Sequence, residues 1–139
     1  MPAERDSLRF YVDESALGIG RTLVAARKDV IHVGHDLSKH VCPPGVPDTV
    51  WIPEIARRGL VVIARDQKIR SRPAELLALR EAGLRVFWIA GKRDMNTWEW
   101  LTRLVRNWDE IERIVSRRPE GPWFYAINER TVTEIRLPS

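Results

Sequence analysis

The sequence predicts an α/β fold with a mainly parallel sheet, because short apolar runs alternate along the chain with segments of helical periodicity. The clearest strand is residues 60–64, Leu-Val-Val-Ile-Ala, a continuous apolar run typical of a strand buried on both faces. Residues 85–89 form a similar run, after a helical segment that Pro73 opens and Gly83 closes. This alternation of strand and helix favours parallel neighbours in one sheet.

The N-terminal part of the chain predicts two further strands with a helix between them. Residues 8–12 form a short apolar run that ends in an acidic turn beginning at Asp13. Ser15 stands where it would cap a helix over about 17–26, and residues 30–33 form the second apolar run. Each strand is therefore followed by a polar or helical connection, as in a layered α/β domain.

A proline-rich segment, residues 34–47, is expected to be a loop. Asp48 then stands at the expected N-cap of a helix that contains Pro53 in its first turns and ends at Gly59. This helix leads directly into the clearest strand, so its N-terminus is expected on the side of the sheet where the preceding strands end.

The C-terminal third predicts a helix and a β-hairpin. One long helix is expected from about 96 to 116, with Asn96 and Glu99 at capping-box spacing. A hairpin is expected over about 123–136, around a turn at Asn128. The apolar stripe of the long helix is expected to consist of Trp98, Leu101, Leu104, Val105, Trp108, Ile111, Ile114 and Val115.

Length and composition limit the kinds of protein that this chain can be. With 139 residues, the chain is expected to be a single domain, 1–139, with its core over about 8–117. Charged residues make up 30% of it, and no apolar run approaches the roughly 20 residues that span a bilayer. No secretory signal precedes the first strand, and Cys42 has no cysteine partner, so a cytoplasmic protein is expected. The formal net charge of +4 favours an anionic partner.

Three aspartates are expected at the carboxyl edge of the sheet. Asp13 and Asp66 each follow a buried strand directly, and Asp48 begins a helix that leads back into the sheet. Ligands of open parallel sheets bind at this edge, near a topological switch point. Three carboxylates repel one another unless a cation neutralises them, and their hard oxygen atoms suit Mg²⁺ or Mn²⁺. The alternative is that they are ordinary turn and cap residues, a role in which aspartate is common.

Three segments around these aspartates resemble the compact PIN-like nuclease family, which includes the VapC-type toxins of bacterial toxin–antitoxin pairs. They are residues 10–14, 48–54 and 61–69, and the resemblance covers about residues 8–90. It implies a PIN-like three-layer α/β/α fold and a Mg²⁺- or Mn²⁺-dependent endoribonuclease. It also implies that Asp13, Asp48 and Asp66 are the catalytic, metal-binding acids. Glu14 is a further candidate ligand, and the implied partners are an RNA substrate and a cognate antitoxin protein.

The chain departs from the family pattern at two positions. Ala64 stands where the family often has threonine, and Lys68 stands where it often has another acid. These departures motivate an alternative function, a non-catalytic binding module that keeps the fold. A phosphoacceptor signalling domain also places acids around Mg²⁺. However, it needs a Lys-Pro step after a late strand, and residues 89–93, Ile-Ala-Gly-Lys-Arg, lack the proline.

Basic residues surround the third aspartate. Arg65, Lys68, Arg70 and Arg72 lie within eight positions of sequence and are expected to bind the phosphates of a substrate, unless they belong to an ordinary solvated loop. Two more basic residues, Arg57 and Arg58, lie on the preceding helix, where either is expected to pair with Glu54. A second group, which consists of His32, His35, His40 and Cys42, matches no common zinc spacing.

Six tryptophans are many for a chain of this length. Core packing is the expected role of Trp51, Trp88, Trp98 and Trp108. Trp100 and Trp123 are expected either in the core or at a contact with a partner or a base. The long helix and the hairpin together carry more apolar surface than one small sheet covers, so a homodimer or a complex with an antitoxin is expected there.

Overall fold

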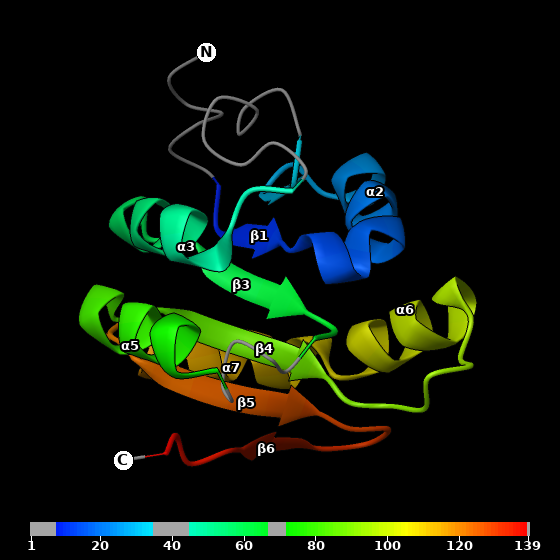
Figure 1. The fold of residues 1–139 in the computed structure, drawn as a ribbon. Helices are drawn as coiled ribbons and strands as arrows, with labels where there is room; N and C mark the ends of the chain where they lie inside the picture. Colours follow the sequence, from blue (N-terminus) through cyan, green and yellow to red (C-terminus); the bar gives the residue numbers. More distant parts are fainter. Residues whose placement is uncertain (1–7, 35–44, 67–71, 139) are drawn as a thin grey trace.

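The computed structural model describes residues 8–34, 45–66 and 72–138. One six-stranded sheet runs through the centre of the molecule, with strand order β2-β1-β3-β4-β5-β6 (Figure 1). The first five strands of this order are parallel, and only β6 runs antiparallel, beside β5. The strands are β1 (Phe10–Val12), β2 (Val30–His32), β3 (Val61–Ala64), β4 (Arg85–Ile89), β5 (Trp123–Ile127) and β6 (Val132–Glu134).

Helices cover both faces of the sheet and make the fold a three-layer α/β/α sandwich (Figure 1). The short 3₁₀ helix η1 (Glu14–Ala16) leads into α2 (Leu17–Ala26). The other helices are α3 (Asp48–Arg57), α5 (Pro73–Ala82), α6 (Thr97–Arg106) and α7 (Trp108–Arg117). Within the described residues no helix is long and apolar enough to cross a membrane. The predicted α/β class with a mainly parallel sheet and a C-terminal hairpin is confirmed.

Alternate residues of each strand enter two separate hydrophobic cores, one on each face. Phe10 and Val12 of β1 pack with α2, α6 and α7, whereas Tyr11 between them packs with α3 and α5. The same alternation places Ile63 in the first core and Val62 in the second. Both faces are therefore buried, which is why these strands are apolar runs without a polar face.

Several local predictions are confirmed. Pro73 is the first residue of α5, and Gly83 ends that helix in the left-handed conformation, with φ of 68°. The Asn96 side chain accepts a hydrogen bond from the Glu99 backbone, and the Glu99 carboxylate accepts one from the Asn96 backbone, which completes the capping box. A close contact that the sequence does not predict lies at Gly20 of α2, where a Cβ atom would come within 2.8 Å of the His32 Cβ.

The prediction of one long C-terminal helix is wrong, because the chain breaks at Asn107 into α6 and α7. The Asn107 side chain is buried and donates hydrogen bonds to the carbonyls of Arg103, at 2.8 Å, and Asn128, at 2.9 Å. The bond to Asn128 ties the junction of the two helices to the hairpin. The apolar stripe also differs from the expected one, since Trp98 is 74% exposed and Val105 is 59% exposed.

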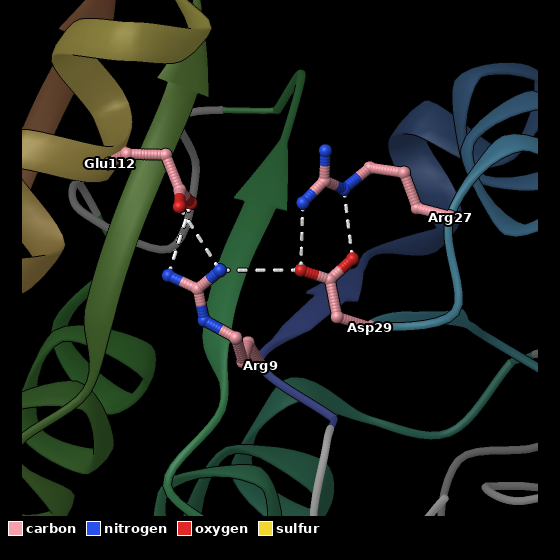
Figure 2. Close-up of polar contacts among 4 residues, drawn as sticks. All are labelled: Arg9, Arg27, Asp29 and Glu112. Atoms are coloured by element: carbon pink, nitrogen blue, oxygen red, sulfur yellow. Dashed lines mark hydrogen bonds and ion pairs between the residues drawn. The ribbon is translucent and has the colours of Figure 1, made fainter.

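A network of ion pairs lies where β1 and β2 begin and links these two strands to α7 (Figure 2). Arg9 bridges Asp29, at 3.3 Å, and Glu112 of α7, at 3.0 Å. Arg27 binds both carboxylate oxygens of Asp29, at 2.8 and 3.0 Å, and its guanidinium lies 4.8 Å from the ring centre of Trp108. Asp29 is thus the anion that Arg9 and Arg27 share, and these two arginines make the contacts with α7.

Asp29 is expected to make folding depend on pH. Burial alone would raise the pKa of this carboxyl, but the hydrogen bonds and charge of Arg27 and the charge of Arg9 outweigh it and lower the pKa. Asp29→Asn should lower the free energy of unfolding by about 1 to 2 kcal/mol near neutral pH, since charged hydrogen bonds are lost in a partly solvated site. The pKa of Asp29 is lower in the folded protein than in the unfolded one. The stability difference between wild type and Asp29→Asn should therefore be complete above the unfolded-state pKa. It should disappear as the pH falls through the folded-state pKa.

Chemical denaturation of both proteins across this pH range measures the difference. Asp94→Asn, a change at an exposed aspartate far from the network in sequence, is the control and should be about as stable as wild type near neutral pH. A stability difference that stays constant down to the lowest pH would contradict the role given to Asp29.

Candidate functional site

Two of the predicted acids meet at the switch point of the sheet. The chain passes from β1 outward to β2 and then returns to β3 on the other side of β1. Val12 of β1 pairs with Ile63 of β3, so both strands end at the same edge, as their arrowheads show in Figure 1. Asp13 follows β1 directly, and Asp66 follows β3 after one intervening residue. Parallel pairing therefore brings together two aspartates that are 53 positions apart in sequence.

Ser15 joins the two strand ends through its hydroxyl group. This hydroxyl donates to Asp13 Oδ2 at 2.8 Å and accepts from the backbone N–H groups of Arg65, at 3.0 Å, and Asp66, at 3.2 Å. Asp13, and not Ser15, is the N-cap of η1, because its side chain accepts from the Ser15 backbone at 3.2 Å. The prediction that Ser15 caps the helix is wrong, since its hydroxyl is engaged between the strands.

Asp48 lies in the first turn of α3, where Pro47 is the N-cap. The prediction of Asp48 as the N-cap is thus wrong by one residue, and its carboxylate makes no cap bond. Instead Asp48 Oδ1 accepts a hydrogen bond from the Trp51 indole N–H at 2.8 Å. Trp51 is buried and packs on Tyr11 of β1, so this contact fixes the aspartate over the end of the sheet.

The predicted acids line one pocket of about 310 Å³ at this edge. Besides Tyr11 and Trp51, its walls include the side chains of Asp13, Glu14, Ser15, Asp48, Asp66 and Arg72. The structure therefore places all three predicted aspartates, the additional candidate Glu14 and one predicted basic residue around a common cavity.

Two carboxyls of the pocket, those of Asp13 and Asp48, have raised pKa values. Burial is the main reason why the pKa of Asp13 is raised. Hydrogen bonds from Ser15 and Glu14 lower this pKa, and the charge of Asp66 raises it further. Burial also raises the pKa of Asp48, against the Trp51 bond, and the charges of Asp13, Glu75 and Asp66 raise it further. The aspartates thus act on one another electrostatically, and each ionised carboxylate makes the next less favourable.

Sequence reasoning missed two residues of this neighbourhood. One is Ser15, whose role depends on a contact between strands far apart in sequence. The other is Glu75 in the first turn of α5, whose charge acts on Asp48. Its position near a helix N-terminus is a common place for an acid, so the sequence pattern alone gave no sign of a functional role.

The carboxylates do not form a ready-made metal cluster. In the described ranges 8–34, 45–66 and 72–138, no group of three or more His, Cys, Asp or Glu side chains is arranged to hold a metal ion. The donor set itself, with hard carboxylate oxygens in a pocket where they raise one another's pKa, is the kind that a divalent cation neutralises. Metal binding at this site therefore stays a prediction.

The basic residues have different environments. Arg72 lines the acidic pocket, and the guanidinium of Arg65 lies 4.2 Å from the ring centre of Trp100. Arg57 and Arg58 both bind Glu54, as predicted. Lys68 and Arg70 lie outside the described residues, as do His35, His40 and Cys42 of the proposed histidine–cysteine group.

The tryptophans divide between core and surface. Trp51, Trp100 and Trp123 are buried, which confirms core packing for Trp51 and selects the core for the other two, where a contact with a partner or a base was the alternative. Trp88 is partly buried and donates from its indole nitrogen to the Arg65 carbonyl at 2.8 Å. The expectation that Trp98 is a core residue is wrong, because α6 packs through Trp100 and Leu104 and leaves Trp98 exposed on another face of the helix.

Ser15 is expected to position the Asp13 carboxylate and to lower its pKa. Ser15→Ala removes the hydroxyl donor, so the pKa of Asp13, already raised by burial, should rise further. It also leaves two backbone N–H groups without their acceptor, which should cost about 1 to 3 kcal/mol of stability. Carboxyl NMR titration and chemical denaturation measure these effects, and Ser15→Thr, which keeps the hydroxyl, is the matched control. An unchanged Asp13 pKa in Ser15→Ala would contradict this role.

Comparison with known proteins identifies the family. The model of a family described as PIN like domain matches residues 8–91, more than half of the chain. The match spans the sheet from β1 to the end of β4 and includes the three pocket aspartates. A search of curated proteins and a search of solved structures each found no match. The chain therefore belongs to the PIN-like domain family, whose fold is commonly that of a nuclease.

Proposed function

We propose that this protein is a metal-dependent endoribonuclease whose active site is the acidic pocket at the ends of β1 and β3. The observation that carries this proposal is the convergence of Asp13, Asp48 and Asp66, from three separate segments, on one pocket at the switch point. Family membership supports it, because the match includes all three positions. The raised pKa values of Asp13 and Asp48 also support it, since perturbed acids in a cleft are frequent at active sites.

Asp13, Asp48 and Asp66 would hold Mg²⁺ or Mn²⁺, with Glu14 as a further candidate ligand on the same wall of the pocket. When bound, such an ion supplies charge that activates water and stabilises the leaving oxygen of a phosphodiester. The chain's own residues then have distinct tasks. Ser15 holds the Asp13 carboxylate, and the Trp51 indole orients Asp48.

RNA is the proposed substrate, bound by Arg65, Lys68, Arg70 and Arg72. Arg72 stands in the pocket wall, where its charge would offset that of a phosphate next to the carboxylates. Arg65 immediately precedes Asp66, and its stack on Trp100 holds the guanidinium at the same edge of the sheet. Lys68 and Arg70 complete the set from the sequence between these two arginines.

The biological role that we propose is that of a cytoplasmic toxin, paired with an antitoxin protein that restrains the nuclease. A homodimer is proposed as its working form. Val105 on α6, an exposed apolar side chain that does not line the cavity beside Trp98, offers surface for such contacts. The toxin role itself rests on the resemblance of the segments around the three aspartates.

A second candidate function is a non-catalytic RNA-binding or protein-binding module. The observation that favours it is the absence, within the described ranges, of three acids arranged to hold a metal ion. Ala64 and Lys68, which differ from the family pattern, favour it as well. The two functions differ in whether the pocket binds a divalent ion, which folding stability reports without knowledge of the RNA target.

Asp48→Asn should make the metal-free protein more stable. The pKa of Asp48 is raised in the folded state, so its ionised form opposes folding at neutral pH, whereas asparagine keeps the oxygen that accepts the Trp51 bond. In EDTA the variant should therefore be more stable than wild type, by less than about 1 kcal/mol because solvent screens this half-buried carboxylate. Wild type should gain stability as Mg²⁺ or Mn²⁺ rises, because an ion that binds only the folded state favours it. The variant should lose most of this gain.

Thermal melting in EDTA and across a metal titration measures both effects, and Asp94→Asn is the control because Asp94 lies outside the pocket. An RNA cleavage assay with the same three proteins should show Mg²⁺-dependent cleavage by wild type and the control alone. If Asp48→Asn melts lower in EDTA and keeps the full metal response, Asp48 is a structural residue and the nuclease proposal loses its main support.

A further inference from the structure

A second and larger cavity, of about 580 Å³, lies beside α6 at the end of β4. Its walls combine aromatic, basic and small polar side chains, and those that matter for binding are Lys92, Met95, Trp98, Thr102 and Arg103. We call it the α6 groove. None of these residues lines the acidic pocket, so the groove is a separate feature of the surface.

Trp98 is the most exposed large apolar side chain in the described part of the chain, at 74%. It lies in the first turn of α6, whose start is fixed by the capping box of Asn96 and Glu99. An indole ring held at the wall of a groove and left open to solvent is suited to stack on a flat partner such as a nucleic-acid base.

The charges in the α6 groove suit a phosphate backbone. Lys92 is exposed and forms no ion pair within the described ranges. Arg103 is held in place by its hydrogen bond to the Ala90 carbonyl, so its guanidinium is fixed at the wall. The groove's two acids are engaged, since Glu99 closes the capping box and Glu129 lies 3.9 Å from Arg106. Lysine and arginine beside an exposed ring form a typical single-strand binding surface.

A rigid contact connects the α6 groove to the acidic pocket. Trp100, which is buried, receives the Arg65 guanidinium on its ring and donates from its indole nitrogen to the Met95 carbonyl at 2.9 Å. Gly91 packs so closely on the same ring that a Cβ there would lie 2.8 Å from it. Arg65 borders Asp66 of the pocket, and Gly91 and Met95 line the groove. The two features therefore lie along one edge of the sheet, joined through Trp100.

From this arrangement we infer that the α6 groove is a binding subsite for single-stranded RNA, in which Trp98 stacks on a base while Lys92 and Arg103 contact phosphates. The inference deepens the proposed function and rests on it, because the bound strand is the flanking part of the RNA whose phosphodiester enters the acidic pocket. The groove gives the nuclease a preference for unpaired RNA, since a base within a duplex has no free face for Trp98.

The test measures binding of fluorescently labelled oligonucleotides by anisotropy in EDTA, where the RNA stays intact and the groove needs no metal. The probes are an oligouridine of about 12 nucleotides and an abasic oligonucleotide of equal length. Trp98→Ala should weaken oligouridine binding at least about fivefold and leave binding of the abasic probe unchanged, because only the base can stack. Trp98→Phe should restore most of the affinity. Lys92→Ala should weaken both probes alike and reduce the slope of log affinity against log salt by about 0.7.

Leu77→Ala is the matched control, because Leu77 is 57% exposed on α5 and lies outside the α6 groove. It should bind both probes as wild type does. Because Trp98 is exposed, Trp98→Ala should melt within a few degrees of wild type, which keeps a loss of binding interpretable.

Three results would overturn the inference: no binding of oligouridine by wild type, equal binding by Trp98→Ala and wild type, or an equal loss for both probes in Trp98→Ala. If Trp98→Ala keeps RNA binding but loses self-association in light scattering, the surface is a contact between two copies and the inference is likewise overturned. The proposed nuclease function fails separately, by the absence of metal-dependent cleavage, and that result leaves a base-dependent role of Trp98 standing.

Discussion

At the centre of the sheet, β1 and β3 lie side by side in parallel, with Phe10 next to Val61 and Val12 next to Ile63. The backbone N–H of Asp13 continues this ladder by donating to the Ile63 carbonyl at 2.9 Å. Beyond the last residue pair, the Ser15 hydroxyl links the ends of β1 and β3, because it accepts hydrogen bonds from the two backbone N–H groups that follow β3. The position of Asp13 relative to Asp66 depends on this pairing, because neither aspartate belongs to a strand or helix that would otherwise hold it.

The pairing has an electrostatic consequence. It buries the Asp13 carboxyl at the end of β1, while α3 presents Asp48 to the same pocket, and both pKa values rise. If these aspartates had only a structural role, their proximity would bring no benefit, because each ionised carboxylate makes ionisation of the others less favourable. Under the proposed function, a divalent ion would reverse this balance, because an ion that binds only the folded state stabilises it.

Sequence patterns predicted the layers, the strand–helix alternation and the three pocket aspartates, because each depends on local features. Continuous apolar runs mark the strands, Pro73 and Gly83 mark the ends of α5, and an acid that directly follows a buried strand lies at the sheet edge by geometry. What failed was decided by contacts between distant segments. The break at Asn107 depends on a hydrogen bond to Asn128, and the role of Ser15 depends on the backbone after β3. The face of α6 that packs on the core is also decided by such contacts, since Trp100 and Leu104 are buried while Trp98 is exposed.

We propose that Asp13, Asp48 and Asp66 bind one divalent ion between them. Diffraction from crystals soaked in Mn²⁺, recorded at a wavelength where manganese scatters anomalously, shows whether they do. An anomalous peak is expected inside the acidic pocket, within coordination distance of carboxylate oxygens from all three aspartates. A pocket without such a peak at saturating Mn²⁺, or a peak held by other residues, would contradict it.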